Sequence, residues 1–289
     1  MKRGIKYGLL LLALLLLIFH PTAWNNLIMT GGRKETVGRV SKKPLLNTAA
    51  VKPRPPAAVP AVNILQLAAH NKDGYNLGSL HRLPFYRRAV YRVPVRSKVV
   101  ALSIDDGPDP RYTPAVLQIL KANHIHATFF VVGREALAYP NLIHEELNDG
   151  NEIGNHTFSH PELLNLSPAA IKSEVSRGAA AIESITGRKP QLFRPPKGFF
   201  NQNTFDVVRQ NHERVIMWTI TVEHSAAPTP QLMAQRINRL TKPGYIILMH
   251  DGRLNRTRTV EALPIIIHDL KARGFRFVTV SQLMAMRGH

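Results

Sequence analysis

From about residue 98 onward, short apolar runs rich in β-branched residues alternate with longer amphipathic stretches. Such runs predict buried strands, and the stretches between them predict helices. The expected strands are Val99–Ile104, Ala127–Val132, Glu152–Asn155, Gln191–Arg194, Val215–Thr221, Tyr245–His250 and Phe275–Val280. Seven strands separated by helices predict a parallel α/β sheet, most simply curled into a barrel, with a doubly wound open sheet as the alternative.

Local signals mark where the helices begin and end. Three expected helices begin with a hydroxyl residue followed by proline, which suits a capped first turn: Thr113-Pro114, Ser167-Pro168 and Thr229-Pro230. Four glycines stand just before an expected strand, where helices commonly end: Gly150, Gly187, Gly244 and Gly274. In either fold, polar residues at the carboxyl ends of the strands are the expected site of chemistry.

The amino terminus carries three cations and then an apolar run, Gly8–Phe19, which is typical of an export signal. The run is short for a span, which takes about 20 residues, but the sequence after it fits a cleavage site poorly. This favours an uncleaved signal anchor, oriented by the cations with the bulk of the chain outside. We expect a single-pass protein of the cell membrane with an extracytoplasmic catalytic domain, or a secreted protein if the leader is cleaved.

Composition divides the chain into four expected segments. Residues 1–24 form the signal anchor or signal peptide, and residues 25–63, rich in Pro, Ala and Lys, form a disordered stalk. Residues 64–95 hold apolar and aromatic residues without periodicity, and we expect an irregular leader segment there. Residues 96–289 form the folded domain, where the polar strand ends predict catalysis.

The net charge of +19 is distributed unevenly. Residues 1–100 hold 17 Lys and Arg against 2 acidic residues, whereas the rest holds 21 against 17. The basic leader and stalk suit anionic head groups or wall polymers, or serve only as a solvated linker. The nearly balanced folded part argues against a nucleic-acid partner. The absence of cysteine excludes disulfides and thiolate ligands, so any metal must use His, Asp or Glu.

Two motifs at strand ends indicate metal chemistry. Asp105 and Asp106 follow the first strand, and His156 and His160 follow the third. Separately, the first motif is an ordinary turn and the second is a weak signal in a chain with 13 histidines. Together, Asp106 and two imidazoles on one side of an expected helical turn form a three-ligand site with open positions, as in zinc hydrolases. Zinc is expected first, with cobalt, manganese, nickel or iron as alternatives.

Two further strand ends carry polar side chains. Arg194 is followed by Pro195 and Pro196, and an arginine there can clamp a carboxylate, although a proline-rich surface loop would look similar. His250 ends the sixth strand, where a general acid would stand, although single histidines are usually structural or merely exposed.

These motifs, in this order, resemble those of the polysaccharide deacetylases of carbohydrate esterase family four, from about Arg96 to the carboxyl terminus. The resemblance implies a distorted (β/α) barrel with fewer strands than the eight-stranded type. It also implies that Asp105 is the catalytic base and that Asp106, His156 and His160 hold one divalent metal ion. Arg194 would then orient Asp105.

The same resemblance places the remaining groups. It makes His250 the acid, Leu248 a wall of the acetyl pocket, and the Lys197 backbone N–H, following Pro195 and Pro196, the oxyanion donor. Trp218 matches the first tryptophan of the family's fourth motif. Two departures follow. Lys197 replaces a common tyrosine, and His224-Ser225 replace an Asp-Trp pair that shapes the sugar pocket and tunes the acid.

The resemblance implies a hydrolase that removes N-acetyl groups from an extracytoplasmic N-acetylglucosamine-containing polysaccharide, with peptidoglycan first because of the anchor and basic stalk. Chitin oligomers, poly-N-acetylglucosamine and O-acetylated xylan are alternatives. A different class of answer is a catalytically silent glycan-binding protein, which the altered fourth motif favours and the retained catalytic positions oppose. We expect a monomer that contacts the membrane through its N-terminal helix.

Overall fold

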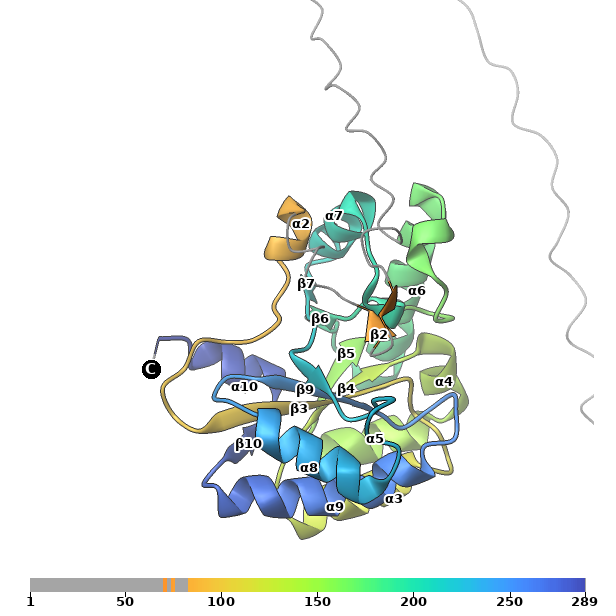
Figure 1. The fold of residues 1–289 in the computed structure, drawn as a ribbon. Helices are drawn as coiled ribbons and strands as arrows, with labels where there is room; N and C mark the ends of the chain where they lie inside the picture. The colour runs from red at the N-terminus through yellow and green to blue at the C-terminus, as the bar shows by residue number, and fades with distance from the viewer. Residues whose placement is uncertain (1–69, 72–73, 76–82, 289) are drawn as a thin grey trace, which may run out of the picture. The chain divides into compact units, whose positions relative to one another are not determined.

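The computed structural model describes residues 70–71, 74–75 and 83–288, and their centre is a barrel-like sheet (Figure 1). Eight strands pair in the order β7-β6-β5-β4-β3-β9-β8, with β10 beside β3, and every pairing is parallel. The strands are β3 (Val99–Asp105), β4 (Thr128–Val131), β5 (Glu152–Asn155), β6 (Leu192–Phe193), β7 (Arg214–Val215), β8 (Ile220–Thr221), β9 (Ile246–His250) and β10 (Arg276–Val278). The predicted parallel α/β architecture is confirmed as a distorted (β/α) barrel, although its sheet has eight strands rather than the expected seven. A separate antiparallel pair joins β1 (His70–Asn71) and β2 (Gly74–Tyr75).

Helices alternate with the strands along the chain. They are α2 (Pro84–Arg87), α3 (Thr113–Ala122), α4 (Gly133–Ala138), α5 (Pro140–Asn148), α6 (Pro168–Thr186), α7 (Gln202–Gln210), α8 (Pro230–Leu240), α9 (Thr257–Ala272) and α10 (Val280–Ala285). Helices α3, α8 and α9 lie together on one side of the sheet, while α6 packs on α7 (Figure 1). No helix of the described residues is long and apolar enough to cross a bilayer. The expected signal anchor and stalk lie outside the described residues.

Side-chain alternation along β3 builds two cores and positions the first catalytic candidate. Val100, Leu102 and Ile104 are buried in the larger core, which also contains residues of α3, α8 and α9. Val99 and Ala101 point the other way, into a second core. The same alternation places Ser103 and Asp105 on the face of β3 that carries Val99 and Ala101. The Asp105 carboxylate therefore stands at the carboxyl end of that face.

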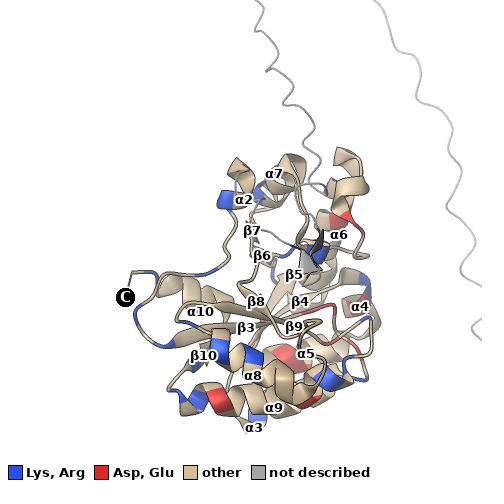
Figure 2. Cartoon of the chain, in the orientation of Figure 1, with Lys and Arg blue, Asp and Glu red and all other residues tan. Residues whose placement is uncertain are grey.

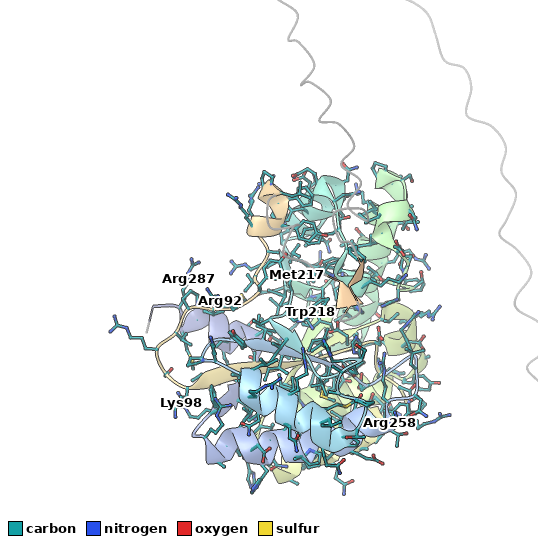
Figure 3. The ribbon with its side chains drawn as sticks, viewed as in Figure 1. Arg92, Lys98, Met217, Trp218, Arg258 and Arg287 are labelled. Atoms are coloured by element: carbon teal, nitrogen blue, oxygen red, sulfur yellow. The ribbon has the colours of Figure 1, made fainter. Side chains whose placement is uncertain are left out.

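The predicted strand Val215–Thr221 is two short strands, β7 and β8, on the two edges of the sheet. Between them, the Arg194 guanidinium occupies carbonyl groups of the segment, donating to Ile216 O (3.2 Å) and Met217 O (3.0 Å). Met217 and Trp218 lie in this crossing (Figure 3). The single expected strand was therefore wrong in detail.

A segment before β3 lies beside β7 and the start of β9. Val90 donates its N–H to Val215 O at 3.0 Å and accepts the N–H of Met217 at 2.8 Å. Val93 donates to Gly244 O at 2.9 Å, beside β9. Backbone groups that the distorted sheet would otherwise leave unpaired are thereby satisfied.

Two of the three predicted helix caps are confirmed. The side chains of Ser167 and Thr229 accept backbone N–H bonds at the starts of α6 and α8. Thr113 does not cap α3. Its hydroxyl instead donates to Asp251 Oδ2 at 2.6 Å and accepts the Asp109 N–H at 2.8 Å. The hydroxyl oxygen thus accepts an N–H that precedes the helix, rather than an N–H of the first helical turn.

Positive charge continues from the basic leader into the residues before β3. Residues 83–98 hold five cations and no acid: Arg87, Arg88, Arg92, Arg96 and Lys98. Arg92, Lys98 and Arg287 project outward on the side where the carboxyl terminus lies (Figures 2 and 3). The carboxyl ends of the strands, in contrast, carry both signs of charge.

Candidate active site

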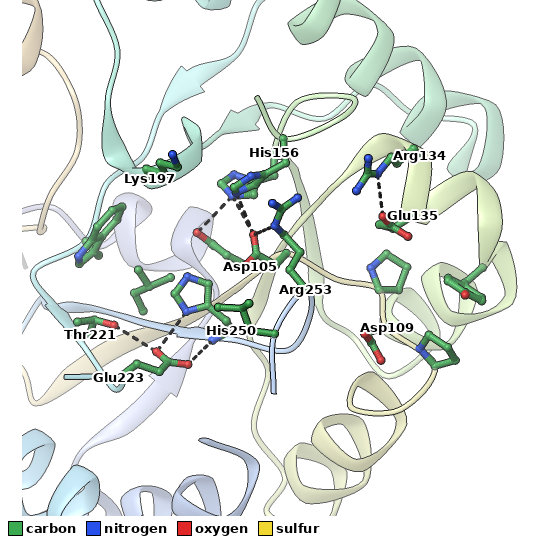
Figure 4. A pocket seen from close by; sticks show the side chains of 18 of the residues that line it. Asp105, Asp109, Arg134, Glu135, His156, Lys197, Thr221, Glu223, His250 and Arg253 are labelled. Carbon is green, nitrogen blue, oxygen red and sulfur yellow. Dashed lines mark hydrogen bonds and ion pairs between the residues drawn. The ribbon is translucent and has the colours of Figure 1, made fainter. Parts of the chain in front are cut away.

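A cavity of ≈ 830 Å³ opens at the carboxyl ends of the strands (Figure 4). It is lined by eight of the residues that the sequence singled out: Asp105, Asp106, His156, His160, Lys197, Trp218, Leu248 and His250. Arg194 is fully buried and contacts the cavity-lining residues Asp105 and His156 from behind. Pro195 is not among the lining residues. Motifs separated by more than a hundred positions therefore meet in one place.

Asp106, His156 and His160 offer three ligand atoms that all lie within 4.8 Å of one another. Asp106 Oδ1 is 3.6 Å from His156 Nε2 and 3.1 Å from His160 Nε2. Asp106 and His156 are buried, and His160 is partly so. This is the arrangement that the sequence predicted for a metal site.

The histidines converge through a loop rather than through the expected helical turn. After β5 the chain has left-handed φ values at Thr157 (68°) and His160 (60°). Asn155 Oδ1 accepts the Thr157 N–H at 3.0 Å, and Thr157 Oγ1 accepts the His160 N–H at 3.0 Å. These side-chain hydrogen bonds turn the chain back on itself. The spacing of four therefore predicts correctly that the two imidazoles converge, but the helical turn that it also predicted is wrong.

The donor chemistry of the three residues fits a divalent cation. His156 Nδ1 lies 2.7 Å from Arg194 O and must donate to it, which leaves a lone pair on Nε2 facing Asp106. Burial lowers the pKa of His160, which favours the neutral form of that imidazole. Asp106 Oδ1 is buried without a hydrogen-bond partner. Two nitrogen lone pairs and a carboxylate oxygen this close are best satisfied by a shared cation.

Arg194 holds Asp105 from below the cavity. Its Nη1 donates to Asp105 Oδ1 at 2.7 Å and to Ser103 Oγ at 2.9 Å. The other guanidinium donors bind two backbone carbonyls, and the group stacks 4.1 Å above the Phe130 ring. One Asp105 oxygen is therefore fixed, and the other, Oδ2, lies 3.8 Å from His156 Nε2 beside the metal-ligand cluster.

His250 has a carboxylate partner that the sequence reasoning missed. Glu223 Oε2 lies 3.2 Å from His250 Nδ1, and Glu223 Oε1 accepts the His250 backbone N–H at 3.1 Å (Figure 4). Burial alone would lower the pKa of His250, but the negative charge of Glu223 outweighs it, so the pKa is raised. Glu223 directly precedes the His224-Ser225 pair. An acidic residue next to the altered motif was therefore the sequence signal that could have identified a partner for His250.

This geometry agrees with comparisons to known proteins. Residues 92–216 match the polysaccharide deacetylase family. The chain is 36% identical over 196 residues to a peptidoglycan-N-acetylglucosamine deacetylase of Bacillus cereus, an alignment that covers 67% of this chain and 92% of that protein. The chain belongs to the polysaccharide deacetylase family. Members are metal-dependent hydrolases that remove acetyl groups from polysaccharides.

Two other relatives show the range of the family. A peptidoglycan-N-acetylmuramic acid deacetylase of Bacillus subtilis is 36% identical over 191 residues, which cover 66% of this chain and 40% of that protein. A solved structure of a family pseudoenzyme from Bacillus anthracis is 30% identical, with a TM-score of 0.64 and coverage of 69% of each chain. Similarity at this level therefore includes both a catalyst and a protein described as a pseudoenzyme.

One departure from the common polysaccharide deacetylase pattern has a visible consequence. Lys197, where a tyrosine is common, has a left-handed φ of 59° and directs its Nζ to Glu162 Oε2 at 2.7 Å. Its side chain is thus engaged at the cavity rim, and its backbone lies beside Trp218, because Gly198 packs directly on that ring.

A second residue that the sequence reasoning missed is Arg256, in the loop after β9. Its Nη2 donates to Asp106 Oδ2 at 3.1 Å, and its Nη1 lies 3.9 Å from Glu223 Oε1. Arg256 therefore links the metal-ligand cluster to the partner of His250. Nothing in the motif spacing singled it out.

Proposed function

We propose that this chain removes N-acetyl groups from an N-acetylglucosamine-containing polysaccharide outside the cytoplasm, with peptidoglycan as the substrate. The observation that carries the proposal is the single cavity in which Asp106, His156 and His160 stand beside an arginine-held Asp105. Peptidoglycan is favoured because the two curated relatives described above are named for acting on it.

The residues around Asp106 provide for the attack on the amide. A divalent cation, when bound by Asp106, His156 and His160, supplies Lewis acidity and lowers the pKa of a water molecule from about 15.7 toward about 7. Asp105 accepts a proton from the attacking water at its Oδ2, while Arg194 holds the other carboxylate oxygen and so aims the group. The Lys197 backbone N–H donates to the oxygen of the former carbonyl group.

His250 completes the reaction. The C–N bond breaks only when the departing amine is protonated, because an amide anion is a poor leaving group. The imidazolium of His250 donates that proton, and Glu223 keeps the imidazole charged at higher pH. The products are acetate and a free amino sugar, while Leu248 and Trp218 bound the space for the acetyl group and the sugar.

We propose zinc as the metal, since two imidazoles and one carboxylate with open positions suit catalytic zinc, with cobalt, manganese, nickel or iron as competitors. The experiment is acetate release from purified peptidoglycan by the chelated protein, with each metal added back at one equivalent. If zinc restores the highest rate, the result supports both zinc as the metal and the removal of acetyl groups from peptidoglycan as the reaction. Acetate release that survives chelation unchanged would overturn the metal-dependent mechanism.

The alternative of a silent glycan-binding protein has less support. The site retains all three candidate ligands, the base, its arginine and an acid with a carboxylate partner, and binding alone requires none of these together. The His224-Ser225 replacement, which favoured silence, is compensated at the neighbouring Glu223. Glycan binding without acetate release under every metal condition would favour the alternative instead.

We also propose that the protein acts as a monomer held to the cell membrane by residues 1–24, with residues 25–63 as a stalk and the catalytic domain outside. The support is the apolar run after three cations and the basic, proline-rich sequence that follows it. Membrane fractionation of cells producing the full chain, with protease added from outside, tests this. Cytoplasmic protein protected from the protease would contradict it.

A further inference from the structure

Three Lys and Arg side chains line the cavity, and two of them have a carboxylate partner of their own. Arg134 pairs with a neighbouring glutamate at 2.8 Å, and Lys197 pairs with another at 2.7 Å. Arg253 differs. Among the described residues, its closest carboxylate is that of Asp106, with Nε 4.0 Å from Oδ1, and its side chain is 35% exposed. Of the cavity cations, Arg253 alone therefore lacks a partner outside the metal-ligand cluster.

Asp106 does not depend on Arg253. The buried Arg256 already donates to Asp106 Oδ2 at 3.1 Å, and its Nε donates to Gly252 O at 2.9 Å, which locks the guanidinium in place. The other oxygen of Asp106 faces His156 and His160. Because Arg256 is already paired with Asp106, the net charge that a second, more exposed guanidinium meets there is small. Arg253 is therefore available to an anion that enters the cavity.

The backbone around Arg253 is shaped to present its side chain. Arg253 has a left-handed φ of 67°, a conformation that residues other than glycine adopt rarely and that concentrates at functional sites. The next residue, Leu254, also lines the cavity and is 68% exposed. A cation and an apolar group thus stand side by side at the rim. In Figure 4 Arg253 lies between His156 and the pair Arg134–Glu135.

We propose that Arg253 binds a carboxylate carried by the same sugar whose acetamide is hydrolysed. This inference rests on the proposed function and narrows its substrate. The contact of 4.0 Å with Asp106 places the guanidinium next to the reaction centre, so the group that it binds must be attached close to the acetamide. A carboxylate on an ether at the adjacent ring carbon meets this requirement, and N-acetylmuramic acid has that substituent.

The chemistry of the rim matches such a substituent. A guanidinium recognises a carboxylate through two parallel N–H···O bonds, which gives both affinity and orientation. The lactyl ether of N-acetylmuramic acid also carries a methyl group, and Leu254 offers it an apolar surface. An N-acetylglucosamine unit has only a hydroxyl at that carbon and leaves Arg253 without an anion. The structure thus favours the acidic sugar of peptidoglycan over the neutral one.

The test compares two soluble glycans of equal length. One is fully N-acetylated chitotetraose, which is neutral, and the other is a peptidoglycan tetrasaccharide without stem peptides, in which N-acetylglucosamine and N-acetylmuramic acid alternate. We expect the wild-type enzyme to prefer the acidic glycan in kcat/KM, with mass spectrometry placing the lost acetyl group on the muramic unit. Arg253→Gln should lower kcat/KM about 10-fold on the acidic glycan and far less on chitotetraose. Arg134→Gln is the matched control and should change the ratio between the glycans less than about 2-fold.

Binding provides a second readout that does not depend on turnover. In a His250→Ala background, which slows the chemistry, Arg253→Gln should weaken binding of the acidic glycan about 10-fold by calorimetry and barely affect chitotetraose. Equal losses on both glycans, or no loss on either, would overturn the inference. If neither glycan releases acetate, the proposed function fails, while the binding preference still decides the role of Arg253.

Discussion

Removing the charge of Glu223 is the sharpest perturbation that the site offers. Glu223→Gln keeps the shape of the side chain and an oxygen that can accept the His250 backbone N–H, but it removes the carboxylate charge 3.2 Å from His250 Nδ1. We expect the imidazole to keep its position and to lose the electrostatic reason for carrying a proton.

The magnitude follows from the contact distance. Unit charges about 3.2 Å apart attract by about 5 kcal/mol at an effective dielectric constant of about 20. Burial of both groups opposes this attraction, since each side chain is only about one-fifth exposed. If roughly half is retained, about 2.6 kcal/mol of support for the imidazolium is lost, which corresponds to roughly 100-fold in rate. This lies at the lower end of what a general acid contributes.

The assay is the pH dependence of acetate release. His250 must be protonated to act, so activity falls as pH rises through its pKa. Glu223 raises that pKa above the ordinary value of histidine, so the wild-type enzyme stays active to higher pH. Glu223→Gln should therefore move the alkaline limb to lower pH and reduce kcat.

The matched control is Glu135→Gln, which removes another cavity-lining carboxylate, one that pairs with Arg134. It should leave the alkaline limb where it is. A Glu223→Gln enzyme within about 3-fold of wild type, with an unshifted alkaline limb, would refute the role of Glu223.

Three further outcomes are expected. Arg194→Lys should lower the free energy of unfolding, measured in urea, by about 3 kcal/mol and kcat by at least about 100-fold. The reason is that a lysine cannot bind Asp105 and two backbone carbonyl groups together. A variant with wild-type stability would count against this. His160→Ala should weaken metal binding by at least about 100-fold in equilibrium dialysis, since one of three ligands is lost, and unchanged affinity would remove His160 from the site. Burial raises the pKa of Glu213 to about 8, so the folded state holds a proton that the unfolded state releases above about pH 4.5, and stability falls as pH rises from there to about 8. Glu213→Gln keeps the oxygen that accepts from Asn155. It should reduce the loss of unfolding free energy between pH 5 and pH 8 by about 2 to 4 kcal/mol, measured by urea titration at both pH values. An equal loss of stability in the variant and the wild-type protein would contradict this.

Much of the barrel could be predicted because hydrophobic periodicity reports directly on buried strands. The expected Glu152–Asn155 strand matches β5 residue for residue, and β3 and β9 agree to within one residue at their ends. The run from Val215 to Thr221 was misread because Arg194, more than twenty residues away, takes the carbonyl groups that a strand would have used. No local pattern carries that information.

In the site, too, local patterns predicted some residues, whereas contacts across the fold determined others. Asp105, Asp106 and His250 were found because they end strands, and strand ends meet at one edge of a parallel sheet. His156 and His160 were predicted from their spacing, although hydrogen bonds of the Asn155 and Thr157 side chains, rather than a helix, bring them together. Partners such as Glu223 and Arg256 act through contacts across the fold, and such contacts do not follow from spacing.

The most direct measurement is acetate release from peptidoglycan by metal-depleted protein as one divalent metal is titrated in, with bound metal measured in parallel. The account predicts negligible release at the start, a rise in proportion to bound metal, and saturation at one ion per chain, with no such rise for an Asp106→Ala variant. Full release without metal, or saturation that the variant reproduces, would contradict it.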